Sequence, residues 1–172
     1  MISPAPRNEI ASGARAERRS ARLAAVQALY QMELGGGDAE TVAQEFLDHR
    51  FQREPELAEA GAPDEALFRA LLAGVPHHQA EIDRAIASCL TASWRLERID
   101  SILRAILRAA ACELIVRHDV PARVVIDEYL EIAHGFCGEE ERTFVNAVLD
   151  RLARRKRPAE FGEAPPDEEP GV

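Results

Sequence analysis

The chain has 172 residues and a mass of 19.0 kDa, which is enough for one domain or two small subdomains with a buried core. Apolar residues make up 47% of it and are rich in Ala and Leu, whereas aromatic residues are only 5%, a balance that favours helices over strands. The formal charge of −9 excludes a protein that coats nucleic acid through bulk positive charge, so any such contact requires a local basic patch.

The first predicted helix begins near Ala14, after a leader over residues 1–14 that is predicted to be disordered because it has Pro, Ser and Gly but no apolar period. Apolar side chains then recur at steps of three and four residues, at Leu23, Val26, Tyr30 and Leu34. The run Gly35-Gly36-Gly37 ends this pattern, and we interpret it as a helix end and not as a phosphate loop.

A second helix is predicted after Asp38, whose carboxylate can cap it, and a loop is predicted over the polar residues 54–63. A third helix is predicted to start near Pro63-Asp64. Pro76 removes the backbone hydrogen bond to residue 72, so we expect a kink or a short break before the apolar pattern resumes at Ile82.

Thr91-Ala92-Ser93 is the predicted boundary between an N-terminal helical subdomain, residues 15–91, and a C-terminal one, residues 92–157. Three helices are predicted in the second subdomain, the first with an apolar face from Trp94 to Leu114, the second opened by Pro121 and the third led by the acidic run 139–141. An acidic tail over residues 158–172, which follows a basic cluster, is predicted to be disordered. The expected fold is therefore all-α, with two small packed bundles of about six to seven helices.

Signatures of catalysis or of a metal site are missing. Three cysteines without paired spacing fit neither a disulfide framework nor zinc, and no histidine lies in an HExxH frame. GxSxG, GxGxxG and P-loop patterns do not occur. We therefore expect no enzyme activity, no metal and no cofactor. Because no apolar run approaches the roughly 20 residues that span a bilayer, we also expect no membrane contact and a cytoplasmic location.

The basic residues at the start of the first helix are more informative. Arg15, Arg18, Arg19 and Arg22 lie at i, i+3, i+4 and i+7, which places them along one helix face. Arg19, Val26 and Tyr30 point within about 40° of one another, so the arginines should continue the buried stripe beyond the core. Guanidinium groups beside an aromatic ring suit single-stranded RNA, although a solvated charged face is the plain alternative.

Several segments together resemble the NusB family of bacterial transcription antitermination factors, over about residues 15–153. They are Arg18-Arg19-Ser20-Ala21-Arg22 with Ala25-Val26-Gln27-Ala28-Leu29-Tyr30, Leu71-Leu72-Ala73-Gly74-Val75, Trp94-Arg95-Leu96-Glu97-Arg98-Ile99, Ile106-Leu107-Arg108 with Glu113-Leu114, and Phe144-Val145-Asn146-Ala147-Val148-Leu149-Asp150. Departures from the family pattern are Ser20 within the arginine cluster, Ala147 where Gly is usual and Thr143 where a lysine can stand.

The resemblance implies a fold of two helical bundles that binds the boxA element of nascent ribosomal RNA together with the ribosomal protein NusE, in the transcription elongation complex. It implies no cofactor. Carried over by position, the RNA surface comprises Arg18, Arg19, Arg22, Tyr30, Phe136, Glu140, Phe144 and Asn146. The NusE surface is expected on the C-terminal subdomain, without assigned residues.

Structural roles for the same residues stay open. Tyr30 and Phe144 also fall on apolar stripes, Phe136 can staple a helix end, Asn146 can bond backbone groups and Glu140 can cap its helix or tune affinity. Two other functions also stay open. One is an RNA-binding accessory protein related to the N-terminal domain of ribosomal RNA methyltransferases, and the other is a helical adaptor that binds only protein.

Overall fold

The computed structural model describes residues 7–91 and 93–163, without the side chains of residues 7–11 and 56. Every regular element within these ranges is a helix, so the predicted all-α class is confirmed. The chain divides into two compact units, Met1–His77 and His78–Val172.

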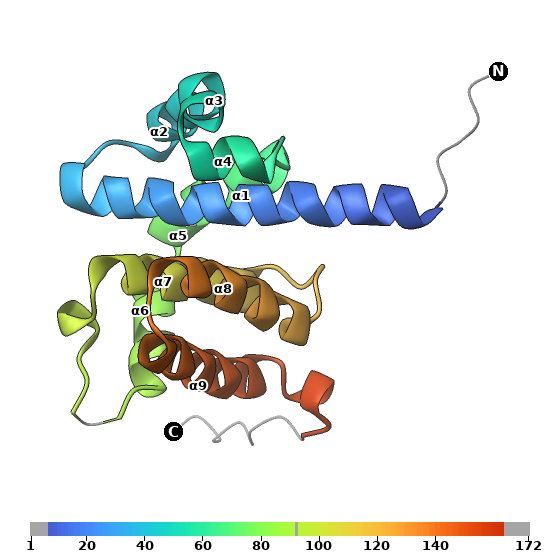
Figure 1. Ribbon diagram of the computed structural model, residues 1–172. Coiled ribbons are helices and arrows are strands. Elements are labelled where there is room, and N and C mark those ends of the chain that lie inside the picture. The colour runs from blue at the N-terminus through green and yellow to red at the C-terminus, as the bar shows by residue number, and fades with distance from the viewer. Residues whose placement is uncertain (1–6, 92, 164–172) are drawn as a thin grey trace. The chain divides into compact units, whose positions relative to one another are not determined.

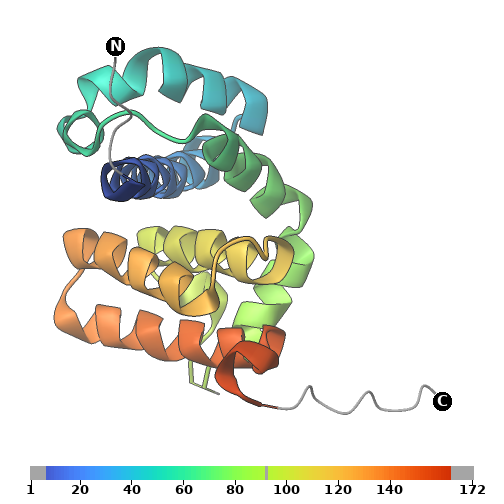
Figure 2. The same cartoon turned by 90° about the vertical axis from the view of Figure 1, so that its right-hand side faces the viewer.

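The first unit is built around α1 (Arg7–Gly35), which packs against α5 (Glu65–His77), α4 (Pro55–Ala60) and α2 (Ala39–Glu45). A π-helical turn over Phe46–Arg50 and the short α3 (Phe51–Arg53) join α2 to α4. Figures 1 and 2 show the long α1 with α2, α3 and α4 along one side of it.

Small side chains on α1 allow its close packing in this unit. Ala21, Ala24, Ala25 and Ala28 are buried, and α5 contributes larger buried side chains, Leu67, Phe68, Leu71, Leu72 and Val75. The Phe68 ring lies 5.9 Å from that of Phe46 and 5.8 Å from that of Phe51, measured between centroids. Close approach of an alanine face and interlocking aromatic rings give the unit its core.

The second unit contains α6 (Gln79–Ser88), a 3₁₀ turn η2 (Leu96–Arg98), α7 (Ser101–Val116), α8 (Ala122–Phe136), α9 (Glu139–Lys156) and a 3₁₀ turn η3 (Pro158–Phe161). Helices α7, α8 and α9 contact one another pairwise, and α6 contacts α7 and α9. Figure 2 shows α7, α8 and α9 lying side by side. Polar contacts also join these helices. Arg108 of α7 forms a two-bond ion pair with Asp83 of α6, and the buried Tyr129 hydroxyl of α8 donates to Glu113 Oε2 of α7 at 2.6 Å.

Helix ends agree with several predictions. Helix α1 ends at Gly35, with Gly36 and Gly37 at φ 75° and 106°, and Asp38 caps α2 by accepting from the Thr41 amide at 3.0 Å. The predicted break at Pro76 is confirmed, since α5 ends at His77 and α6 begins at Gln79. Pro76 lies inside the last turn of α5, where it lacks the backbone hydrogen bond to residue 72, and the helix ends one residue after it.

Three predicted irregular segments contain helical turns in the structure. Helix α1 starts at Arg7, so the leader prediction is wrong for residues 7–14, while residues 1–6 lie outside the described ranges. The expected loop over 54–63 contains α4, and the expected tail begins with η3 at Pro158–Phe161, whereas residues 164–172 are not described. The prolines and charges of residues 54–63 and 158–172 had suggested irregular chain. Both α4 and η3 begin with a proline, however, and proline is well suited to the first turn of a helix.

The division into units also falls earlier than the boundary suggested near residue 91. Helix α6 packs on α7 and α9, which assigns it to the second unit, and the division coincides with the Pro76 break. The helix expected from Trp94 begins only at Ser101, after the Asp100 N-cap. Trp94 lies before it with 51% of its surface exposed, so its assignment to the apolar helix face is wrong.

Candidate nucleic-acid interface

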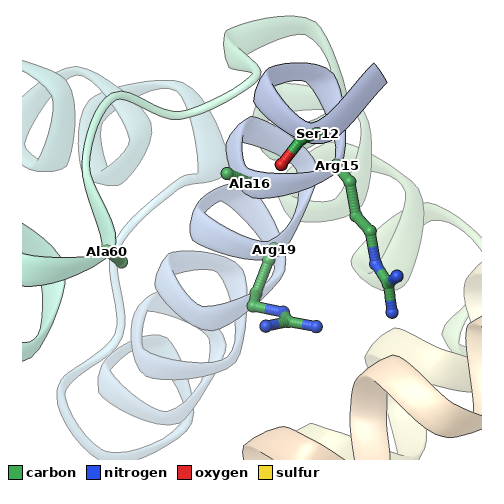
Figure 3. A pocket seen from close by; sticks show the side chains of 5 residues that line it. All are labelled: Ser12, Arg15, Ala16, Arg19 and Ala60. Atoms are coloured by element: carbon green, nitrogen blue, oxygen red, sulfur yellow. The ribbon is translucent and has the colours of Figure 1, made fainter. Parts of the chain in front are cut away.

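Two arginines near the start of α1 line a pocket of about 480 Å³. Arg15 and Arg19 are exposed, and they share the pocket with Ser12, Ala16 and Ala60. Figure 3 shows both guanidinium groups extending from the same side of α1. Two such groups with small neighbours leave room for an anion such as a phosphate, to which arginine can present paired N–H donors.

The backbone around this pocket is held by hydrogen bonds between α1 and the turn that follows α4. The buried Ser20 hydroxyl donates to the Gly61 carbonyl at 2.8 Å, and the Asp64 amide donates to the Glu17 carbonyl at 2.9 Å. Gly61 has a φ of 86°, a backbone angle that residues with a side chain rarely adopt. Ser20, which interrupts the arginine cluster in the sequence, therefore fastens the turn beside the pocket.

The remaining predicted residues of α1 differ in exposure. Arg18 is half-buried and Tyr30 is 37% exposed, so both reach the surface. Arg22 is only 1% exposed, which does not fit its prediction as a direct RNA contact. The phase argument placed the arginines in line with the buried stripe, and the buried part of that stripe extends as far as Arg22. The exposed part begins one turn earlier, at Arg19.

The second group of predicted residues lies in the second unit, at the end of α8 and the start of α9. Phe136 is 39% exposed, Glu140 and Asn146 are exposed, and Phe144 is half-buried. The Phe144 ring lies 5.1 Å from the Trp94 ring between centroids. Trp94 was missed as a site candidate because its sequence position suggested a core helix. Its exposure and its contact with the half-buried Phe144 ring become visible only in the structure.

The basic cluster at the end of α9 has structural partners. Arg151 donates to the Cys89 carbonyl at 2.9 Å and Arg155 to the Ser88 carbonyl at 2.8 Å, so both satisfy acceptors at the end of α6. Arg154 pairs with Asp150 and Glu163 and lies over the Phe161 ring. These arginines stabilise helix ends and neutralise nearby acids, which makes them weak candidates for RNA contact.

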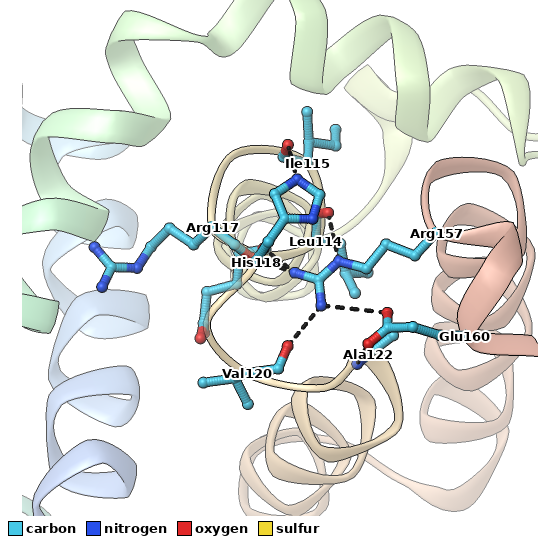
Figure 4. A network of polar contacts seen from close by, with 9 residues as sticks. Leu114, Ile115, Arg117, His118, Val120, Ala122, Arg157 and Glu160 are labelled. Carbon is cyan, nitrogen blue, oxygen red and sulfur yellow. Dashed lines mark hydrogen bonds and ion pairs between the residues drawn. The ribbon is translucent and has the colours of Figure 1, made fainter.

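Arg157 is the most buried of this cluster, with 6% exposure, and Figure 4 shows its guanidinium among carbonyl groups at the end of α7. It donates to Glu113 O at 2.7 Å, Leu114 O at 3.0 Å and Val120 O at 2.6 Å, and also to Arg117 O. Its Nη1 also lies 3.5 Å from Glu160 Oε2. One arginine thus caps α7 and holds the α7–α8 connection.

Groups suited to catalysis do not gather in the described ranges. No set of three or more His, Cys, Asp or Glu residues there could hold a metal ion. Burial raises the pKa of the Cys112 thiol to about 11, and desolvation also raises the pKa of Cys137, so neither resembles an activated nucleophile. Among the described helices none is long and apolar enough to cross a membrane.

Comparisons with known proteins agree on one family. The model of the NusB family matches residues 19–154. The transcription antitermination protein NusB of Maricaulis maris is 54% identical over 144 residues, covering 84% of this chain and 90% of the relative. That of Caulobacter vibrioides is 51% identical over 147 residues, covering 85% of this chain and 99% of the relative.

Solved structures show the same fold. The T. maritima NusB structure has a TM-score of 0.69 and 33% identity, covering 84% of this chain and 96% of that chain. A crystal structure of the antitermination factors NusB and NusE in complex with dsRNA has a TM-score of 0.60 at 23% identity, covering 79% of this chain and 95% of that chain.

Proposed function

Because the chain belongs to the NusB family, we propose that it is a non-catalytic transcription antitermination factor that binds boxA-type RNA of nascent ribosomal transcripts together with NusE. In this function it joins the elongation complex and supports processive transcription of ribosomal RNA. Its relatives carry the name of transcription antitermination protein. A structure of the same fold contains NusB, NusE and RNA, which supports both kinds of partner.

The observation that carries the RNA part of the proposal is the pocket lined by Arg15 and Arg19. The chain has a net charge of −9, so it cannot attract RNA through its overall charge. Two arginines exposed on one side of α1 supply the local positive charge that phosphate recognition requires. Arg15 therefore joins the predicted contacts, and the buried Arg22 is left out of them.

We assign the other contacts by position and exposure. In the first unit, Arg18 contacts phosphate and Tyr30 takes a base face. In the second unit, Phe136 and Phe144 offer aromatic faces and Asn146 offers an amide for base edges, while Glu140 tunes affinity because it cannot attract phosphate. Each unit thus brings its own surface to the RNA.

Titration of fluorescently labelled boxA RNA with this protein, with and without NusE, tests the proposal by fluorescence anisotropy. We expect tighter binding to boxA than to a scrambled RNA of equal length, and a further increase in affinity when NusE is present. Equal affinity for both RNAs would contradict boxA recognition, and an unchanged affinity with NusE would contradict joint binding.

The same titration, together with a methyl-transfer assay, tests the two other functions. A helical adaptor that binds only protein predicts no RNA binding at any salt concentration. An RNA-binding accessory protein related to the N-terminal domain of ribosomal RNA methyltransferases predicts RNA binding without a preference for boxA and without a gain from NusE. We expect no transfer from a labelled methyl donor to RNA, and clear turnover would contradict the non-catalytic part of the proposal. The relatives are separate antitermination proteins of which the alignments cover 90% and 99%, which favours the antitermination function over both.

A further inference from the structure

Trp94 presents a large apolar ring to solvent beside a second aromatic side chain. Trp94 is the single tryptophan of the sequence, and 51% of its surface is exposed. Its ring and the half-buried Phe144 ring are 5.1 Å apart between centroids and are inclined by 34°. The two side chains therefore form one aromatic surface on the second unit, reached from solvent mainly through Trp94.

The residues that directly follow Trp94 are held by packing and by hydrogen bonds. The buried Leu96 and Ile99 anchor it just beyond Trp94. Arg104 of α7 donates to the carbonyls of Leu96, Glu97 and Ile99 at 3.2, 3.2 and 2.9 Å, and the Trp94 amide donates to the Thr91 carbonyl at 2.9 Å. The backbone directly after Trp94 is thus held in place, which limits the conformational entropy lost when the ring binds a ligand.

We propose that Trp94 and Phe144 form a stacking platform for an unpaired base of the bound RNA. This inference rests on the proposed function and adds Trp94 as an RNA-contacting residue. An aromatic face binds any base through its π surface, which is how single-stranded RNA is commonly held. The platform is continuous with the proposed RNA surface, because Phe144 belongs to both.

Charges around the platform favour a base over a phosphate. Glu140 lies one helical turn before Phe144 on α9 and is exposed, so a phosphate directly above Phe144 would meet a carboxylate. Arg95 is exposed next to Trp94 in the chain and is available for the adjoining backbone of the RNA.

The first test uses the intrinsic fluorescence of the protein, because Trp94 is its single tryptophan. Titration with unlabelled boxA RNA, excited at a wavelength selective for tryptophan, should quench the emission of the wild-type protein in parallel with binding. Emission that stays constant while labelled RNA in a matched titration reports binding by anisotropy would overturn the inference and leave the proposed function intact. No RNA binding by either signal would overturn both.

The second test compares variants by anisotropy with labelled boxA RNA. Trp94→Ala should weaken binding by roughly 5- to 150-fold, the range found for loss of one stacked base, and Trp94→Phe should weaken it less because a ring remains. Val124→Ala, which shortens another exposed apolar side chain of the second unit, is the matched control and should bind like wild type.

The salt dependence of RNA binding distinguishes a stacking contact from an ionic contact with phosphate. Because Trp94 pairs with no phosphate, Trp94→Ala should leave the slope of log affinity against log salt unchanged, whereas loss of an arginine contact should reduce it. Wild-type affinity for RNA in Trp94→Ala, with or without a loss of NusE binding, would overturn the inference; in the case of such a loss the platform would be a protein contact.

Discussion

Arginines of this chain have different roles according to their burial, although they look alike in the sequence. Arg15 and Arg19 are exposed at a pocket, whereas Arg22 is 1% and Arg157 is 6% exposed. An exposed guanidinium can pair with phosphate at small cost, but a buried one is retained because it satisfies groups inside the protein. Substitutions of these residues should therefore affect either binding or stability.

The double substitution Arg15→Ala with Arg19→Ala should weaken boxA binding by about 1–3 kcal/mol, because two charge-assisted contacts are lost. Both residues are exposed, so the Tm should change little. Anisotropy and thermal melting measure the two effects. In contrast, Arg22→Ala should lower the Tm, since it removes a buried side chain. Equal RNA affinity for wild type and the double variant would contradict the assignment of the pocket.

Arg157→Met should lower the free energy of unfolding by about 2–4 kcal/mol, because buried carbonyl groups at the end of α7 lose their donor. Urea denaturation followed by circular dichroism measures this change. Lys156→Met is the matched control, since Lys156 is exposed at the neighbouring position. A cost for Arg157→Met no larger than that of the control would show that the Arg157 network contributes little.

At the scale of helices, each element is placed by a few contacts at its ends as well as by its apolar face. In the first unit the turn between α4 and α5 is joined to α1 through Ser20 and Glu17. In the second unit, Arg151 and Arg155 of α9 cap α6, and Arg157, which follows α9, caps α7. Such contacts connect residues far apart in the sequence and so escape an analysis of local spacing.

Ser20→Ala should lower the free energy of unfolding by about 0.5–1.5 kcal/mol, the usual net contribution of one hydrogen bond, because the Gly61 carbonyl loses its partner. Chemical denaturation measures the difference. Ser12→Ala, on the same helix but exposed, should change stability much less. If both variants were equally stable, the Ser20 bond would not hold the turn.

At the scale of the whole molecule, an acidic chain is proposed to bind an acidic polymer. The net charge of −9 opposes non-specific attraction, so binding depends on few local cations. Because only a few ion pairs form with the RNA, the affinity of the protein alone for RNA should be modest, and a partner protein can raise it. We therefore expect the protein to bind RNA more tightly when NusE binds jointly with it.

The salt dependence of boxA binding by the protein without NusE should therefore be shallow for a nucleic-acid-binding protein. Three arginines, Arg15, Arg18 and Arg19, predict a slope of about −2 in log affinity against log salt, since each phosphate contact contributes about 0.7 on single strands. Anisotropy titrations between low and physiological salt measure it. A slope several times steeper would indicate cations outside the arginine start of α1.

The sequence by itself determined the helical class, most helix ends and the family. Apolar spacing, the glycine run after Leu34, the Asp38 cap and Pro76 act through bonds within a few residues, so they can be read from local order. The phase of α1 correctly aligned the arginines with the buried stripe.

Only the tertiary structure decided which side chains on that stripe reach solvent. Burial depends on contacts between helices, which placed Arg22 inside and Arg19 outside although they are three residues apart. The same contacts assigned α6 to the second unit, gave the basic end of α9 its carbonyl partners and left Trp94 exposed against Phe144. Spacing fixes the direction of a side chain on its own helix, while packing of distant segments determines what that side chain meets.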